Sequence, residues 1–196
     1  MRVGWSSSHG EFLIDDYYYF SKLKQRAEEQ GIRIVQESSF YRLERYDVII
    51  FNYPERRFRI REAGRIRSWL KKGKTVIFTS YYNNIDGVSE VVNRVLERIG
   101  SNMRLNLDTV RDRRENYRDP MLPVGKWRQK SVVMPCTSSI EGGSPLVRNS
   151  SFVFGSYEEI HQGKIAIIGT CVFWDNFTID KLSNTEFAIS LLGSDL

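Results

Sequence analysis

Short apolar runs alternate with amphipathic helical patterns along the first hundred residues, and this alternation restricts the fold more than any other feature. The runs at 48–51 and 76–78 are continuously apolar, which is typical of parallel strands buried on both faces. Apolar residues recur at helical spacing over about 16–30, 60–72 and 86–98. Strand–helix alternation with short connections predicts an α/β fold with a doubly wound, mostly parallel sheet.

The second half of the chain has a different character, with short candidate strands separated by Pro, Gly and Ser. The highly charged segment 111–130 contains two prolines and is predicted to be a long loop. A glycine before the apolar run at 164–170 suggests a hairpin with 151–154. The simplest organisation is one domain, 1–196, with a β-rich excursion at about 102–160. The strands expected in this sheet and excursion are 2–6, 32–35, 47–52, 75–80, 104–110, 131–134, 146–154 and 164–170, and a last helix is expected at 185–192.

Composition excludes several classes of protein. No apolar stretch is long enough to span a membrane, and the N-terminus lacks the apolar region of a signal peptide. The only cysteines, Cys136 and Cys171, do not form a disulfide framework. We therefore expect a cytoplasmic protein. Arginines that alternate with acidic residues also suit a thermophilic protein.

The first strand-to-helix loop contains three serines, a histidine and a carboxylate within residues 6–12. Ligands of open α/β sheets bind outside the carboxyl ends of the strands, where this loop is expected. We expect a ligand crevice there, and no motif identifies its cofactor or ligand. Its predicted lining comprises Ser7, Ser8, His9, Glu11, Asn52, Ser80, Tyr81, Thr170 and Asp175.

Motifs at 8–11, 46–50, 62–73, 75–78, 168–173 and 184–192 follow one another along the chain. Their order resembles that of the class I glutamine-amidotransferase-like superfamily. The similarity is greater to its non-catalytic branches, which include prokaryotic domains of unknown function and the GIFT-type domain of intraflagellar-transport proteins. This resemblance implies a flavodoxin-like sheet.

Glutaminase activity is not expected, because the position of the nucleophile in that superfamily has no cysteine here. The corresponding turn reads Thr79-Ser80-Tyr81-Tyr82-Asn83, without a glycine. Two bulky tyrosines fit poorly in the sharp turn that such a nucleophile needs. The chain is therefore expected to be a non-catalytic domain that binds a ligand, a protein partner or a second copy of itself.

An alternative function is a hydrolase or transferase that uses His9 and Glu11. Histidine can act as an acid or base near neutral pH, and Ser80 could serve as a nucleophile. A metal could assist if Asp15, Asp16 or Asp175 joined His9 and Glu11, although the spacing lacks a metal-binding pattern. A purely structural role for the loop, with its serines and Glu11 capping the helix, is the competing interpretation.

A second alternative is nucleic-acid binding, since the net charge is +5 and basic residues are clustered. Trp127 could stack on a base. A solvated, ion-paired surface explains the same residues and is favoured. The candidate contacts are Arg57, Arg61, Arg65, Lys72, Arg113, Arg114, Trp127 and Arg128.

Overall fold

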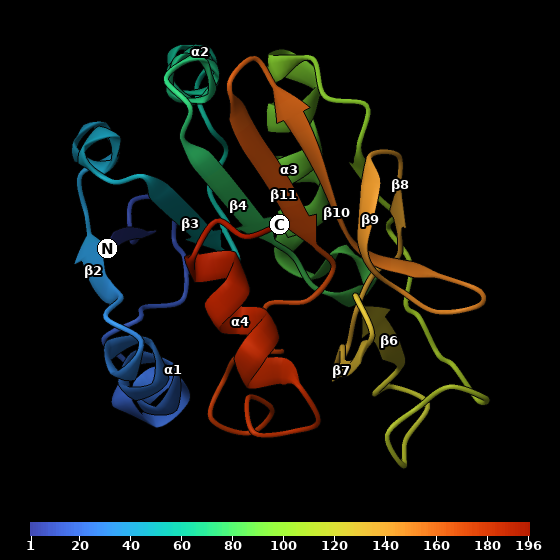
Figure 1. Cartoon of the computed structure of the whole chain (residues 1–196). Helices are drawn as coiled ribbons and strands as arrows, with labels where there is room; N and C mark the ends of the chain where they lie inside the picture. Colours follow the sequence, from blue (N-terminus) through green and yellow to red (C-terminus); the bar gives the residue numbers. More distant parts are fainter.

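A nine-stranded sheet forms the centre of the computed structural model, which describes residues 1–196 (Figure 1). The strand order is β2-β1-β3-β4-β11-β10-β9-β6-β7, and β5 and β8 form a separate two-stranded sheet. The strands are β1 (Arg2–Ser6), β2 (Arg33–Glu37), β3 (Val48–Asn52), β4 (Thr75–Thr79), β5 (Arg104–Leu105), β6 (Val124–Trp127), β7 (Lys130–Val133), β8 (Ile140–Glu141), β9 (Ser144–Arg148), β10 (Val153–Ile160) and β11 (Gly163–Ile168). The helices are α1 (Tyr17–Glu29), α2 (Ile60–Lys71), α3 (Val88–Ile99) and α4 (Asn184–Leu192), with 3-10 segments η1 (Phe40–Arg45) and η2 (Tyr82–Gly87).

Half of the sheet is parallel and buried on both faces. Strands β2, β1, β3, β4 and β11 pair in parallel. Side chains alternate between the faces of a strand, so Ile50 and Ile77 join the core that includes residues of α1 and α4. Phe51 and Phe78 join the other core, with residues of α2 and α3. Figure 1 shows α4 in front of the sheet and α3 behind it.

The other half is antiparallel, and this corrects the expected fold class. Strand β10 pairs antiparallel with β11 and with β9, and β6 pairs antiparallel with β9 and with β7. The main sheet thus has as many antiparallel as parallel pairings. No helix connects these strands, so the chain returns by direct turns, which give antiparallel neighbours. The prediction of a flavodoxin-like, mostly parallel sheet with a β-rich excursion was wrong, because the strands after residue 102 extend the same sheet.

The expected elements of the first half agree with the structure to within about two residues, and the hairpin of β10 and β11 is confirmed. The second half departs further from expectation. The predicted strand at 146–154 is divided by a turn, in which Asn149 Oδ1 accepts hydrogen bonds from the N–H groups of Ser151 and Phe152. Strand β6 lies inside the segment predicted as a loop. None of the helices has the length and hydropathy needed to cross a membrane.

Close backbone packing after β11 makes Gly169 a test of this fold. A Cβ atom at Gly169 would lie 2.1 Å from the carbonyl oxygen of Ser138. We expect Gly169→Ala to destabilise the protein by about 1–3 kcal/mol and to lower the Tm by roughly 3–10 °C. The matched control is Gly64→Ala in α2, where a Cβ meets nothing within 4 Å. It should raise the Tm slightly, and equal Tm values for the two variants would contradict the packing.

Candidate functional site

A cavity of about 240 Å³ lies at the carboxyl ends of the parallel strands. Five separate segments contribute to it: the loop after β1, α1, the segment after β3, the segment after β4, and the loop after β11. It is smaller than the usual range for drug-sized ligands, about 300–1,000 Å³, and suits one side chain or one small molecule. Its lining residues are Phe12, Tyr19, Phe20, Tyr53, Tyr81, Cys171, Val172 and Asp175.

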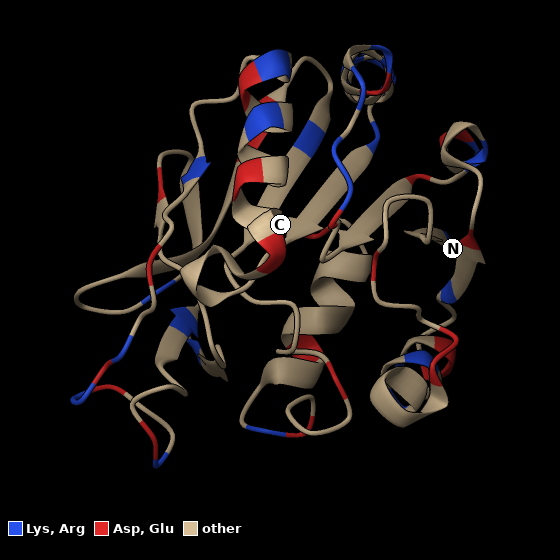
Figure 2. Ribbon diagram, turned by 180° about the vertical axis from the view of Figure 1, so that it is seen from behind, with Lys and Arg blue, Asp and Glu red and all other residues tan.

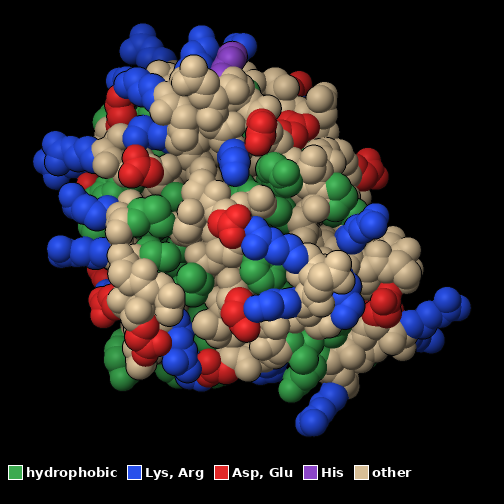
Figure 3. Space-filling view, in the orientation of Figure 1, with side chains coloured by type: hydrophobic (Ala, Val, Ile, Leu, Met, Phe, Trp, Pro, Cys, Tyr) green, Lys and Arg blue, Asp and Glu red, His purple; other side chains and the backbone are tan.

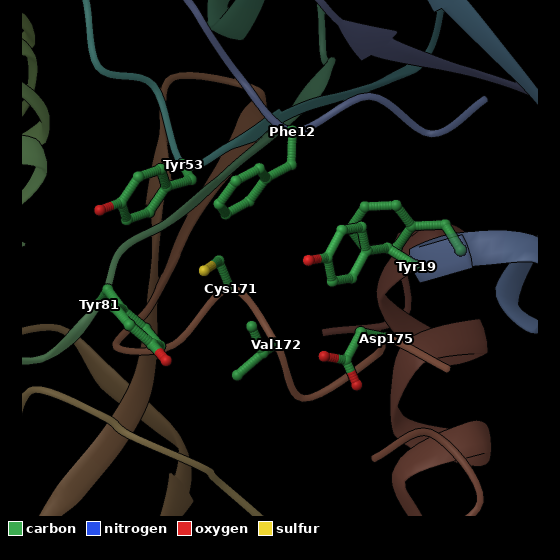
Figure 4. A pocket seen from close by; sticks show the side chains of 8 residues that line it. Phe12, Tyr19, Tyr53, Tyr81, Cys171, Val172 and Asp175 are labelled. Carbon is green, nitrogen blue, oxygen red and sulfur yellow. The ribbon is translucent and has the colours of Figure 1, made fainter. Parts of the chain in front are cut away.

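Aromatic rings form most of the cavity wall. Figure 4 shows Phe12, Tyr19, Tyr53 and Tyr81 around the space, with Cys171 between them. Phe12 and Tyr53 stack at 4.9 Å between ring centroids, with an interplanar angle of 11°. Tyr81 stands nearly perpendicular to Tyr53, at 84° and 6.1 Å. The rings therefore enclose the space from different directions and do not form a flat slot.

Tyr53 is held in the wall by an uncommon backbone conformation. Its φ is 66°, in the left-handed region that bulky residues rarely adopt. Its N–H donates to Thr79 Oγ1 at 3.0 Å, and its hydroxyl donates to Asp86 Oδ2 at 2.8 Å. These bonds fix the backbone of Tyr53 and the hydroxyl end of its side chain, and they offset the conformational cost.

Asp175 is the only carboxylate in the cavity lining. It is 5% exposed and forms no ion pair with any lysine or arginine of the chain. The N–H groups of Phe177 and Thr178 both donate to Oδ1, at 3.0 and 2.9 Å. Burial raises the pKa of the Asp175 carboxyl above its ordinary value, and these hydrogen bonds oppose that shift only in part.

Asn176 ties the loop after β11 to the first turn of α1. Its side-chain amide donates to the carbonyl oxygens of Tyr17 and Tyr18, at 3.1 and 2.7 Å. Its Oδ1 accepts from the N–H of Lys22 at 2.9 Å, and its N–H donates to the carbonyl of Tyr19 at 2.7 Å. The two segments that carry Tyr19 and Asp175 are thereby held at a fixed separation.

Exposed aromatic side chains continue from the cavity onto the surface. We call Tyr17, Tyr18, Tyr19 and Phe177 the aromatic patch. Tyr17 is 84% exposed and Phe177 is 53% exposed. Tyr18 packs edge-on against Tyr19 at 4.9 Å and against Phe177 at 5.4 Å. Tyr19 belongs to both the patch and the cavity lining, so the two form one continuous surface.

His9, a predicted catalytic residue, lies in the core and not in the cavity. It is 5% exposed, and its ring stacks on Phe58 at 3.9 Å. Its Nδ1 bonds with Ser8 Oγ at 2.8 Å, and its Nε2 lies 3.4 Å from Glu62 Oε2. Glu62 also accepts from the N–H of Arg59 at the start of α2. His9 therefore connects the first loop to that helix.

Glu11 also faces inward, where its Oε2 accepts from the N–H of His9 at 2.5 Å and its Oε1 has no partner. No group of three or more His, Cys, Asp or Glu side chains is placed to hold a metal ion. The structure thus gives no support to metal-assisted chemistry by His9 and Glu11.

Of the nine predicted crevice residues, Tyr81 and Asp175 line the cavity and the other seven do not. Asn52, Ser80 and Thr170 are fully buried. Their side chains bond internally, to Thr79 and Trp174, to Ser89, and to the carbonyl of Pro135, respectively. Ser7 and Ser8 precede His9 outside the lining.

Apart from Tyr81, sequence reasoning missed the aromatic residues of the cavity. Tyr53 directly follows β3, and Tyr81 lies two residues after the end of β4, so a position just after a parallel strand was a usable signal. The run of three tyrosines could not all face one side of a helix, so some of them had to lie at the surface or at a crevice. Phe12 had no such signal, because its place depends on the conformation of the loop.

The candidate nucleic-acid residues do not form one surface. Arg65 and Lys72 both pair with Glu44. Trp127 is buried against Phe187, and Arg128 pairs with Asp195 at 2.7 Å. Basic and acidic positions alternate on α3 in Figure 2, and Lys and Arg are interspersed with Asp and Glu in Figure 3. The remaining candidates, on exposed or partly exposed loops and helix ends, are Arg57, Arg61, Arg113 and Arg114.

Comparison with known proteins finds one close relative in sequence. An uncharacterised protein of Aquifex aeolicus strain VF5 is 34% identical over 224 aligned positions, which cover 98% of this chain and 93% of that protein. No protein-family model matches the sequence.

Solved structures share the fold at low sequence identity. The N-terminal domain of mmIFT52 has a TM-score of 0.77 and 16% identity, and the match covers 97% of this chain and 96% of that chain. A β-galactosidase of the haloarchaeon Halorubrum lacusprofundi has a TM-score of 0.60 and 11% identity. The GH42 β-galactosidase Gan42B has a TM-score of 0.59 and 12% identity. This chain spans only about a third of each β-galactosidase, 30% and 29% respectively.

These comparisons correct the superfamily assignment. They show no link to glutamine amidotransferases, and the mmIFT52 domain shares the mixed-sheet fold. The resemblance to the amidotransferase-like superfamily was therefore wrong. It rested on the order of loose motifs, most of which lie in strands and helices.

A structural role for His9 predicts a loss of stability on substitution. His9→Asn removes the ring that packs on Phe58, so we expect about 2–4 kcal/mol of destabilisation and a Tm lowered by roughly 5–12 °C. His161→Asn is the control, because that histidine is exposed in a turn with φ 59°. A Tm of the His9 variant equal to that of the wild type would exclude this role.

The burial of Asp175 predicts a pH-dependent effect on stability. Because its pKa is raised in the folded state, its contribution to stability falls as the pH rises through that pKa. Asp175→Asn keeps the oxygen that accepts from Phe177 and Thr178. It should raise the Tm by a few degrees at about pH 7.5 and by almost nothing near pH 4. Thermal melts across this range would contradict the assignment if the difference grew as the pH fell.

Proposed function

We propose that this chain, which belongs to the same protein family as the Aquifex aeolicus relative, is a protein-binding domain that docks a partner on the aromatic patch and cavity. The observation that carries the proposal is their continuity: Tyr19 lines the mostly apolar cavity and also contacts the exposed rings of Tyr18 and Phe177. Large exposed apolar patches on soluble proteins mark interaction sites, and tyrosine and phenylalanine are enriched at protein interfaces.

Rigidity of this surface supports binding. The patch and the cavity are joined through Asn176, whose hydrogen bonds fix α1 against the loop after β11. Tyr53 is fixed by Thr79 and Asp86. When a surface is already ordered before association, the free-energy cost of ordering its side chains on binding is smaller.

The chemistry of the cavity favours binding over catalysis. Its lining has no histidine, serine or lysine. Burial raises the pKa of the Cys171 thiol well above its ordinary value, so the nucleophilic thiolate is scarce. The β-galactosidase matches cover about 30% of those chains, which supports the view that this fold can serve as one module among others.

Substitution of the aromatic patch should abolish partner capture without unfolding the protein. We expect Tyr18→Ala combined with Phe177→Ala to weaken the complex with its partner about 10–100-fold, the effect of losing interface hot spots. The measurement is cross-linked capture from cells of the source organism with quantitative mass spectrometry, followed by a Kd with the purified partner.

Tyr41→Ala is the matched control, because Tyr41 is 57% exposed on η1, away from the patch. A partner must be retained by the wild type and this control but lost by the patch variant. Equal capture by all three proteins would refute docking at the patch. Sedimentation of the purified chain at rising concentration identifies the case in which the partner is a second copy.

A further inference from the structure

We infer that the cavity beside the aromatic patch receives the ammonium group of a lysine side chain supplied by the docked partner. This inference rests on the proposed function, since it names the chemical group that the partner inserts. Three independent features of the cavity support it: its aromatic walls, its unpaired carboxylate and its size.

The aromatic walls suit a compact cation. The face of an aromatic ring carries partial negative charge, and it attracts a cation that lies within about 6 Å of the ring centroid. Phe12, Tyr19, Tyr53 and Tyr81 stand around one space (Figure 4). The plane of Tyr81 lies at 84° to that of Tyr53. Rings in such different orientations enclose a compact cation such as an ammonium group. A planar cation such as a guanidinium group would fit better between parallel rings.

The carboxylate of Asp175 supplies the opposite charge. It lines the cavity, is 5% exposed and forms no ion pair within the chain, although the charge of Lys181 acts on it from a greater distance. A buried charge without a counter-ion is costly, and pairing relieves that cost. The N–H groups of Phe177 and Thr178 occupy Oδ1. Oδ2 accepts neither of these two hydrogen bonds. Pairing through one carboxylate oxygen suits the ammonium group of lysine, which is a point charge, better than the guanidinium group of arginine, which binds both oxygens of a carboxylate.

The remaining wall suits the stem of lysine. Phe20, Cys171 and Val172 are apolar, and the cavity volume is about 240 Å³. A cavity of about 150 Å³ already holds benzene, so a four-carbon chain with its ammonium group fits. Lysine buries its methylene stem along apolar surface while its head group stays paired or solvated. No lysine or arginine of this chain occupies the site.

Butylammonium, which has the stem and head group of lysine, tests the inference by NMR titration of the full isotope-labelled chain. 1-Butanol is the neutral probe of matched shape. We expect butylammonium to shift the signals of Tyr53, Tyr81 and Val172 and to bind about tenfold more tightly than 1-butanol. Asp175→Asn should remove this preference, whereas Asp180→Asn, an exposed carboxylate on the same loop that pairs with Lys22, should keep it.

Equal binding of the two probes to the wild type, or no binding of either, would overturn the inference. A preference that survives in the Asp175→Asn protein would do so as well. Tighter binding of tetramethylammonium or butylguanidinium than of butylammonium would assign the cavity to a small quaternary cation or to arginine, against lysine. None of these outcomes contradicts docking at the aromatic patch, because the Tyr18 and Phe177 substitutions test that proposal separately.

Discussion

The hydrogen bonds of Asn176 hold together the parts of the molecule on which the proposed site depends. They join the first turn of α1 to the loop after β11, two segments that lie at opposite ends of the sequence. On one side of Asn176, Asp175 faces the cavity; on the other, Phe177 lies exposed in the aromatic patch. The side chain of Asn176 therefore fixes the positions of Asp175, the aromatic cavity wall and the aromatic patch relative to one another.

The first half of the fold could be predicted because its signals are local. Continuous apolar runs mark β3 and β4, and α1 begins where the side chain of Asp16 caps it. The direction of the later strands could not be predicted, because a short apolar strand looks the same whether its neighbour is parallel or antiparallel. The decisive features there are turns, such as the one that Asn149 closes between β9 and β10. Such turns depend on side-chain hydrogen bonds that spacing does not reveal.

The edge of the sheet that carries the cavity could also be predicted, but most of its residues could not. Gly10, with φ 78°, reverses the chain between His9 and Phe12. His9 then lies beneath the loop against Phe58, while Phe12 reaches the cavity. Polar residues in this loop suggested a ligand crevice, yet His9 and Glu11 are buried and bond within the protein. The aromatic residues, which attract less notice in a sequence, form the accessible surface.

The position of β11 has a consequence for how the chain acquires its structure. This strand lies between β4 and β10, yet it follows β4 only after the whole segment from residue 80 to residue 162. Until β11 arrives, β4 is an apolar edge strand with unpaired backbone groups, the arrangement most prone to pair with other chains. A ribosome-bound or truncated chain that ends before residue 163 would not be a smaller version of this protein. In it one side of β4 would have no neighbouring strand, and that neighbour is supplied when β11 joins the sheet.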